Sequence, residues 1–439
     1  MPTISSLLHQ FFNDMKYIKY ILVVSLLGVH FPVLFAQPLK PRPDAFPPVA
    51  ENYGAKAVQM AATVEEMSGW DRYPTYETYV AMMQGWAEQY PTLCRLDTIG
   101  TSVNGRLILC MIIKGEESSQ SQRPEFFYSS TMHGDEVTGY VMMLRLIDTL
   151  LSGYGSNQQY TDLINSVDIY INPLANPDGT YRRGNSTVQG SVRYNANNVD
   201  LNRNYPDPFG TAPLNPQQQE NTAMIDYFTN HHFRLSANLH GGSEVMNYPW
   251  DSFTSRQRPH PDRDWWIEVS RRFVDTSRMY SRSCFRDVTT EGYIEGGDWY
   301  VISNGRQDYV NYYHDCREMT MEISSVKTLS SDQLPAYWRF LQHSFVNYIG
   351  EIFTFYTPDD PVGIDAVGSK AITMQVFPNP AGDRAFLREP MPMESVLYDM
   401  KGMEVQRIPA GQKLIDLTTL PSGLYLLRCG TATTKLIRQ

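Results

Sequence analysis

The sequence is short of cysteine and of positive charge, and it has few long apolar runs. Its 439 residues include five cysteines, and their wide spacing does not match a cysteine-based zinc cluster. The formal net charge of −10 and the pI of about 5.4 argue against a nucleic-acid-binding protein. Beyond the N-terminal region no apolar run is long enough to span a membrane, and no internal repeat is visible. The composition, with 42% hydrophobic and 19% charged residues, is typical of a globular protein.

The one long apolar run lies near the N-terminus and has the pattern of a secretory signal. Residues 15–37 read "MKYIKYILVVSLLGVHFPVLFAQ", in which two lysines precede an apolar core and Ala36 is a suitable cleavage residue. A membrane anchor is the alternative, but Pro32 and the shortness of the run disfavour it. We therefore expect a signal peptide over residues 1–36, with Met15 as a candidate for the true start.

From about Tyr73 to Phe355, apolar runs of strand length alternate with amphipathic stretches of helical length. The expected strands are 107–113, 125–131, 167–173, 234–240 and 317–323, and the expected helices are 136–152, 216–230, 262–281 and 332–352. Asn215 followed by Pro216 is a favourable cap and first residue for the second of these helices. Strands buried on both faces and separated by helices predict an α/β domain with a largely parallel central sheet.

Three further segments flank this domain. Residues 37–72 begin with a Pro-rich stretch and are expected to form a lead-in. The composition changes again over 356–374, which we interpret as a linker. Residues 375–439 have short alternating strands and turn signals such as "NPAGD" and "PSGLY", a pattern that predicts a small all-β sandwich.

Cys94 and Cys110 stand on either side of "GTSVNGR" (100–106), which is suited to a hairpin. The two strands of such a hairpin could place both cysteines side by side, and an exported protein could join them in a disulfide. Two buried thiols are the alternative.

Polar residues gather where predicted strands end, which is where open α/β sheets bind ligands. The motif "HGDE", with His133 and Glu136, follows one strand, and His240 ends another. Glu322 lies in the apolar run "REMTMEI", where an unpaired charge would be costly to bury. On its own "HGDE" could be a metal site, an acid/base pair or a charged turn, and the motif alone does not decide whether Asp135 or Glu136 would be the ligand. Together with a distant histidine, it is typical of catalytic zinc, which takes three protein ligands.

Four other histidines are weaker candidates for metal ligands. His231, His232, His260 and His314 lie in polar surroundings, so we expect them at the surface.

A second polar cluster is "RYNANNVDLNRNYPD" (193–207). Arg193, Asn202 and Arg203 supply guanidinium and amide donors that match a carboxylate, which suggests an anionic substrate group beside the metal. A surface loop with solvated arginines is the alternative.

The motifs "HGDE", "NPDG", "VDLNRNYPD", "ANLHGG", "NYPWD" and "EMTMEIS" resemble, in order and rough spacing, those of the zinc metallocarboxypeptidases of the carboxypeptidase A/B superfamily. The pattern is most similar to the N/E-type branch, which includes enzymes that remove basic residues. The resemblance spans about Tyr73 to Phe355. It implies an α/β fold with a twisted mixed, largely parallel sheet of about eight strands and helices on both faces.

The resemblance also implies roles for individual residues. His133, Glu136 and His240 match the zinc ligands, so one Zn²⁺ per chain is expected. Glu322 matches the general base that takes a proton from zinc-bound water and passes it to the leaving amine. Arg193 matches the arginine that polarises the scissile carbonyl.

Other matching residues would hold the substrate. Asn202 and Arg203 match the pair that binds the terminal carboxylate, and Asp200 matches a carboxylate that orients a zinc histidine. Tyr300 matches the mobile tyrosine that caps the bound residue, although the family usually has glycine where this chain has Asn304.

The resemblance also implies which residues select the C-terminal side chain of the substrate. Asp251 falls where basic-specific relatives keep the acid that meets a Lys or Arg side chain, and Gln307 falls at the base of the pocket. A cap on a surface turn is the alternative role for Asp251.

The implied function is a secreted zinc carboxypeptidase that hydrolyses the C-terminal peptide bond and releases Lys or Arg. An enzyme of the same fold that cleaves cell-wall peptides at diaminopimelate is the first alternative. An inactive surface-binding protein is an alternative of another class, although it would be expected to have lost a ligand or Glu322.

The motifs "VFPNPAGD", "LYDMKGMEV" and "IDLTTLPSGLYLLRC" in residues 375–439 resemble the C-terminal sorting domain of type IX secretion cargo. This resemblance implies the type IX machinery as a partner, besides peptide or protein C-termini. It implies a secreted protein or one on the outer-membrane surface of a Gram-negative bacterium, with no membrane span in the mature chain.

Overall fold

The computed structural model describes residues 58–115, 123–355, 376–377, 381–387, 394–399, 403–429 and 432–438. The chain divides into two compact units, Met1–Asp360 and Pro361–Gln439. The expected signal peptide and linker lie outside the described residues, as does most of the lead-in. The described end of the lead-in is ordered: β1 (Met60–Ala61) pairs in parallel with β2 (Tyr73–Pro74), and η2 (Glu65–Met67) lies between them.

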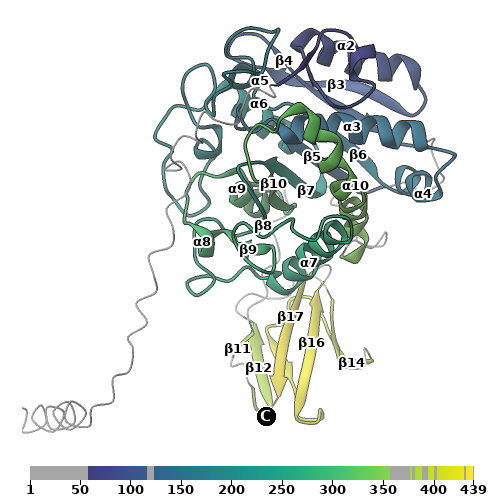
Figure 1. Ribbon diagram of the computed structural model, residues 1–439. Coiled ribbons are helices and arrows are strands. Elements are labelled where there is room, and N and C mark those ends of the chain that lie inside the picture. Colours follow the sequence, from purple (N-terminus) through teal and green to yellow (C-terminus); the bar gives the residue numbers. More distant parts are fainter. Residues whose placement is uncertain are drawn as a thin grey trace, which may run out of the picture. The chain divides into compact units, whose positions relative to one another are not determined.

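The first unit is built on an eight-stranded mixed sheet (Figure 1). Its strands are β3 (Cys94–Thr101), β4 (Leu107–Ile113), β5 (Glu125–Ser130), β6 (Asp168–Asn172), β7 (Phe233–His240), β8 (Ser243–Tyr248), β9 (Tyr293–Glu295) and β10 (Arg317–Ser324). Their order is β3-β4-β6-β5-β7-β10-β8-β9, and the central strands β6, β5, β7 and β10 run parallel. The predicted α/β fold with a largely parallel sheet is confirmed.

Helices cover both faces of this sheet (Figure 1). They are α2 (Tyr76–Gln89), α3 (Thr138–Gly153), α4 (Gln158–Ser166), α5 (Pro177–Thr180), α6 (Gln219–Asn230), α7 (Arg263–Tyr280), α8 (Gly296–Trp299), α9 (Arg306–Tyr313) and α10 (Leu334–Gly350). Short 3-10 turns are η3 (Leu201–Arg203), η4 (Ser331–Gln333) and η5 (Glu351–Thr354).

Successive side chains of β5 point to opposite faces of the sheet and contact different helices. Phe126 and Tyr128 contact the aromatic rings of α10, whereas Phe127 packs edge-on against Phe228 of α6. Helices α3, α4 and α7 pack with α10, and α9 packs on β10 in the same core cluster as α6. The site described below lies on the α6/α9 face.

One predicted helix start is wrong. Helix α6 begins at Gln219 rather than at Pro216, and no side chain caps it. The side-chain amide of Asn204 donates to the carbonyls of Asn215 and Pro216 and accepts from the Gln218 N–H. These bonds hold residues 215–218 in a non-helical conformation, so tertiary contacts override the local capping signal.

The hairpin around 100–106 forms as β3 and β4, but its register separates the two cysteines. Cys94 is opposite Ile113, and Cys110 is opposite Asp97. Both are free and buried, as in the alternative of two buried thiols.

The prediction that His260 lies at the surface is wrong. Its side chain is buried against Trp250, and burial lowers the pKa of His260 to about 4.

The second unit is all-β, as predicted. Its strands are β11 (Val376–Phe377), β12 (Arg384–Leu387), β13 (Ser395–Tyr398), β14 (Glu404–Ile408), β15 (Leu414–Asp416), β16 (Gly423–Cys429) and β17 (Ala432–Arg438). They form a three-stranded and a four-stranded antiparallel sheet around one apolar core.

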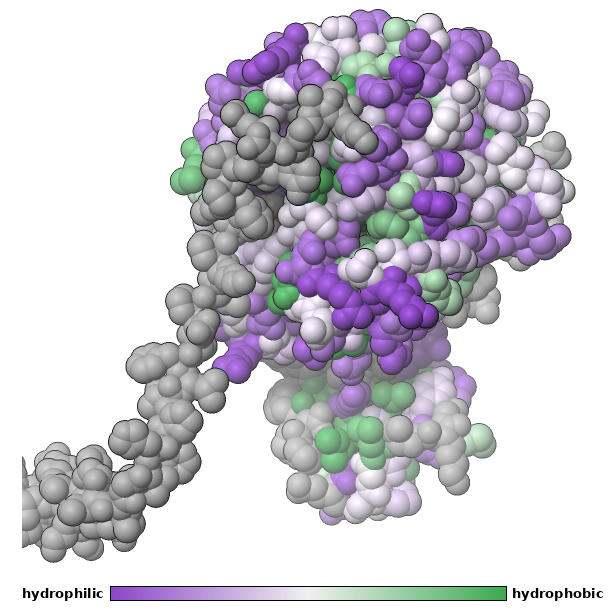
Figure 2. All heavy atoms as spheres, viewed as in Figure 1, coloured by the Kyte–Doolittle hydropathy of each residue, from purple (hydrophilic) through white to green (hydrophobic). Residues whose placement is uncertain are grey.

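Hydrophilic residues dominate the face of the first unit that is visible in Figure 2, with hydrophobic residues scattered among them. Within the described part of the chain, no helix combines the length and apolarity that a membrane crossing requires.

Candidate active site

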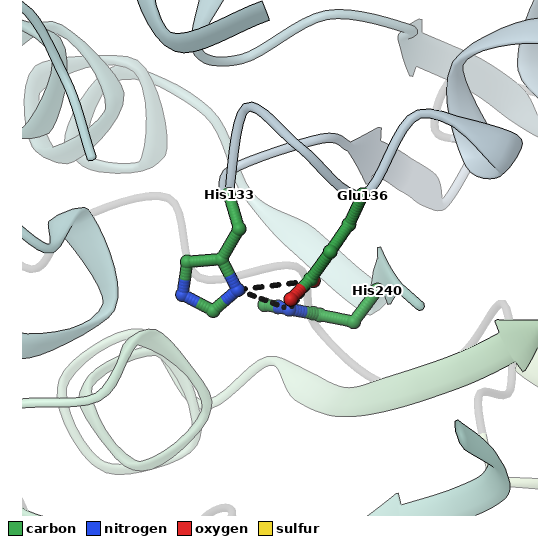
Figure 3. Close-up of side chains that lie close together, drawn as sticks. All are labelled: His133, Glu136 and His240. Carbon is green, nitrogen blue, oxygen red and sulfur yellow. Dashed lines mark hydrogen bonds and ion pairs between the residues drawn. The ribbon is translucent and has the colours of Figure 1, made fainter. Parts of the chain in front are cut away.

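Two chain segments bring His133, Glu136 and His240 together at the carboxyl end of the central strands (Figure 3). The chain leaves β5 through Thr131, whose φ of +59° reverses its direction into the "HGDE" loop. Gly134 is required in this loop, because a Cβ there would lie 2.3 Å from the backbone of Gly179. His240 is the last residue of the adjacent strand β7.

The three side chains are buried and their donor atoms meet at one point. Nδ1 of His133 lies 3.0 Å from Nδ1 of His240 and 3.0 Å from Oε2 of Glu136, and that oxygen lies 2.8 Å from Nδ1 of His240. Two imidazole nitrogens and one carboxylate oxygen are the ligand set of catalytic zinc sites. Such a group of lone pairs, held together away from water, is stabilised by a bound cation.

The outer nitrogens of both rings are bound in a way that suits metal ligation. Nε2 of His133 donates to Oδ1 of Asp200 at 3.1 Å, which leaves the lone pair on Nδ1. Nε2 of His240 lies 2.7 Å from Nδ2 of Asn238, whose Oδ1 is buried without a partner among the residues the structure describes. With the amide turned by 180°, Oδ1 would accept from Nε2–H and leave the lone pair of His240 on Nδ1. The residues present therefore fit a zinc ion.

Charges around the site keep its carboxylates ionised. Burial would raise the pKa of Glu136, but His133 and His240 outweigh it and hold that pKa well below its usual range. Burial also opposes ionisation of Asp200, yet His133, Arg193 and Arg203 lower its pKa further than burial raises it.

Arg193 lies directly beside the three candidate metal ligands. Its Nε donates to Oδ2 of Asp200 at 2.9 Å, and its Nη1 lies 3.1 Å from Nδ1 of His133. Nη1 also lies 3.5 Å from Oε1 of Glu136, so the guanidinium group faces the point where the three ligand atoms meet. The positively charged guanidinium group of Arg193 can therefore stabilise a negative charge that develops on a substrate oxygen.

Glu322 is placed by the register of the sheet. It is the residue of β10 opposite His240 in the parallel pairing of β7 and β10. Side chains opposite each other in a parallel pair point to the same face, so Glu322 and His240 share one face of the sheet. Glu322 is 4% exposed and stands beside a proposed ligand, as a general base would.

Asn202 and Arg203 lie in η3, directly after Asp200. The backbone N–H of Asn202 donates to Oδ1 of Asp200, and the Asn202 side-chain oxygen accepts from the backbone N–H of Arg306 at 2.9 Å. The Asn202 amide nitrogen is thereby oriented as a donor. Arg203 donates from Nη1 to the backbone carbonyl of Asn202 at 2.8 Å. One loop thus carries an amide donor and a guanidinium group beside the proposed metal site.

Asp251 is buried beside Gln307 and two glycines. Oδ1 of Asp251 accepts from Nε2 of Gln307 at 3.0 Å. A Cβ on Gly305 would lie 3.6 Å from both Oδ2 of Asp251 and Oδ1 of Asn202, and a Cβ on Gly296 would collide with Oδ1 of Asp251. The lack of a side chain at Gly296 therefore leaves room for this carboxylate, which lies near Gly305 and near the residue proposed to hold the substrate terminus.

Tyr300 is half-buried and begins the loop between α8 and α9, where its ring packs against Trp299. Asn304, in the same loop, has a φ of +62° and donates from its side chain to the carbonyls of Tyr205 and Thr211. Asparagine tolerates this conformation better than other residues with a Cβ, which explains how it replaces the usual glycine.

Sequence reasoning missed three residues around the site: Asn238, Lys327 and Asp308. Asn238 could have been found, because it lies two residues before His240 and must share its face of the strand. Lys327 contacts Asp135 at 3.0 Å and Glu136 at 3.7 Å, and it has no local sequence signal. Asp308 accepts one hydrogen bond from the backbone N–H of Asp251.

Comparison with known proteins places most of the chain in one family. The model of the zinc carboxypeptidases matches residues 79–343, and the model of the secretion system C-terminal sorting domain matches residues 375–439. Carboxypeptidase D of Anas platyrhynchos is 34% identical over 292 residues, covering 64% of this chain and 21% of that protein. Carboxypeptidase M of Mus musculus is 33% identical over 294 residues, covering 64% of this chain and 66% of that protein. The chain thus spans about a fifth of carboxypeptidase D.

Solved structures agree on the fold. The crystal structure of thrombin activatable fibrinolysis inhibitor matches with a TM-score of 0.57 and 17% identity, covering 66% of this chain and 76% of that one. Carboxypeptidase A from Helicoverpa armigera matches with a TM-score of 0.54 and 20% identity, covering 64% and 74%. At these identities the likeness supports the fold of the first unit alone.

Proposed function

Because this chain belongs to the zinc carboxypeptidase family and carries a secretion sorting domain, we propose that it is an exported exopeptidase that removes Lys or Arg from peptide C-termini. The observation that carries the proposal is the meeting of three ligand atoms, from His133, Glu136 and His240, next to Glu322. Its substrates, specificity and destination are part of the proposal.

We assign one zinc ion to His133, Glu136 and His240. When bound, zinc supplies a Lewis acid that polarises the scissile carbonyl and makes water more acidic. Glu322 accepts a proton from the attacking water and delivers it to the leaving amine. Arg193 stabilises the negative charge that develops on the carbonyl oxygen, and Asp200 holds both Arg193 and His133 in place.

Recognition of the chain end is assigned to Asn202 and Arg203. A free C-terminal carboxylate matches an amide donor and a guanidinium group, and this anchor places the last peptide bond at the metal. We propose that Tyr300 closes over the bound residue, since it lies in the loop before α9.

Specificity for Lys or Arg is assigned to Asp251, with Gln307 beside it at the base of the proposed pocket. Oε1 of Gln307 accepts from the N–H of Thr320 at 2.6 Å, so the amide must turn its Nε2 donor toward Asp251. Asp251 therefore serves as an acceptor, which suits a carboxylate that meets a cationic side chain. An apolar side chain would bring no positive charge to this buried carboxylate and would have to be buried against it, at a cost in binding.

The sorting domain over 375–439 supports export by the type IX machinery, to the cell surface or the medium. Peptides outside the cell would then be the substrates. Such a destination favours peptide hydrolysis over trimming of the cell wall, which lies in the periplasm.

A blocked C-terminus tests the exopeptidase assignment. We expect a peptide that ends in Lys with a free carboxylate to be cleaved at least about 100-fold faster, in kcat/KM, than the same peptide ending in an amide, because Asn202 and Arg203 lose their anionic partner. Acetylating the N-terminus is the matched control and should change the rate little. Equal rates on the free and amidated peptides, or cleavage at internal bonds, would contradict the assignment.

A further inference from the structure

The first turn of α9 holds the loop that carries Asp251. Arg306, Gln307 and Asp308 are consecutive and buried, and each side chain points to a different partner. Gln307 contacts the Asp251 side chain, as described above. Asp308 contacts the backbone of the same loop: Oδ1 accepts from the N–H of Asp251 at 2.8 Å, and Oδ2 accepts from the N–H of Ser252 at 2.9 Å.

Two bonds to successive N–H groups constrain the backbone more than one would. They fix the orientation of both peptide planes next to the Cα of Asp251, and so the direction in which its Cα–Cβ bond points. The loop is tied down at a third point, because the carbonyl of Asp251 accepts from the N–H of Ile302 at 3.0 Å. The position of the Asp251 carboxylate therefore depends on where Asp308 stands.

The helix start that carries Asp308 is held in place by a buried ion pair. The guanidinium group of Arg306 donates to Oε2 of Glu318 at 2.8 Å, and both side chains are fully buried. The Arg306 side chain also lies over the rings of Phe127 and Phe228. Because a buried ion pair is costly to break, it anchors the N-terminus of α9 to the central strand β10.

A carboxylate is required for this contact. Both partners of Asp308 are N–H donors, and only an ionised carboxylate offers each of them a lone pair without presenting a donor of its own. Burial raises the pKa of Asp308 to about 6, although its hydrogen bonds to residues 251 and 252 oppose the shift. The group is therefore ionised at neutral pH.

We propose that Asp308 is a positioning residue for substrate selection, which fixes the Asp251 carboxylate where it can meet the ammonium or guanidinium group of a C-terminal Lys or Arg. This inference rests on the basic specificity proposed above. Asp308 acts through the backbone of Asp251, so its loss should weaken recognition of the basic side chain and leave the chemistry at the metal intact.

The test is the substitution Asp308→Asn, assayed at neutral pH on two peptides that differ only in a last Lys or Leu. An amide can accept from only one of the two N–H groups and sets its own N–H against the other. A displacement of about 1 Å at a binding group can cost roughly 100-fold. We expect kcat/KM for the Lys peptide to fall by roughly 10- to 100-fold, mainly through KM, while the value for the Leu peptide changes less than about threefold.

The matched control is Asp298→Asn. Asp298 lies in α8 and accepts from the N–H of Ser255 at 2.9 Å, so it supports the same loop at a point away from Asp251. Its substitution should leave the Lys-to-Leu ratio within about threefold of the wild-type value. If Asp308→Asn does not fold, the variant Asp308→Glu serves instead. It keeps the negative charge but displaces the carboxylate oxygens, and it should lower the ratio of kcat/KM for the Lys peptide to that for the Leu peptide.

The outcomes separate this inference from the proposed function. A wild-type enzyme that prefers Lys, with an unchanged ratio in the folded Asp308 variants, would overturn the role of Asp308 and leave the basic specificity standing. Equal losses on both peptides would also overturn it, because they would indicate general damage. A wild-type enzyme without preference for Lys would overturn the specificity itself, and this inference with it.

Discussion

Replacing Glu322 with glutamine is expected to reduce kcat by about 1,000-fold while zinc stays bound. Glutamine has nearly the same shape as glutamate and can keep the hydrogen bonds of an acceptor, but it cannot take up a proton at neutral pH. General-base catalysis contributes roughly 10²- to 10⁴-fold in enzymes, so its loss should fall within that range. Zinc content measured by mass spectrometry should remain one ion per chain, since Glu322 is not among the three proposed ligands.

Glu244→Gln is the matched control for this experiment. Glu244 is also a buried glutamate, on the neighbouring strand β8, but it is opposite Ile323 and so faces the other side of the sheet. There it accepts from the hydroxyl of Tyr337 and the N–H of Phe285. We expect its activity to stay within a few-fold of wild type. Near-normal turnover by Glu322→Gln would contradict its role as the base.

Replacing Asp251 with asparagine or alanine is expected to change which C-terminal residue is released. A Lys or Arg side chain in the pocket would lose its counter-charge, and removing one partner of a buried ion pair costs roughly 100-fold or more in binding. We expect kcat/KM for a peptide ending in Lys to fall by about that factor, while a peptide ending in Leu is cleaved equally well or better. Steady-state kinetics on matched peptides measure both values.

The Leu peptide serves as the internal control for Asp251. A loss that is equal on the Lys and Leu peptides would remove Asp251 from the specificity pocket, because the damage would then be general. Zinc content should not change in either variant, since the buried ligand set does not include Asp251. A zinc loss would indicate that the substitution disturbs the metal site rather than the pocket.

The sequence could predict which face of a strand carries the chemistry. In "RLSANLH" the polar residues Asn238 and His240 alternate with aliphatic ones, and "REMTMEI" has the same alternation at Thr320 and Glu322. A period of two places each polar set on one face of its strand. What the sequence could not predict is the register that puts Glu322 opposite His240, because that pairing joins residues far apart in the chain.

Capping signals and hydrogen-bond partners were harder to predict for the same reason. The expected start of a helix at Pro216 is wrong because Asn204, a dozen residues earlier, binds the carbonyls of Asn215 and Pro216. The support of Asp251 by Asp308 likewise depends on a contact between a loop and a helix start. Local patterns predicted most elements, and the family resemblance supplied the candidate ligands, whereas the orientation of the Asp251 side chain depends on contacts between distant segments.

The most direct test of the account is a panel of peptides identical except for the last residue, which is Lys, Arg, Leu, Glu or diaminopimelate. Each peptide is incubated with the purified enzyme as prepared, after treatment with a chelator, and after zinc is restored, and the released amino acid is quantified. We expect release of one C-terminal residue, faster for Lys and Arg than for Leu by at least about tenfold, lost on chelation and recovered with zinc. Cleavage that ignores the last residue or survives chelation, or no cleavage of any peptide, would contradict a zinc-dependent carboxypeptidase specific for basic residues.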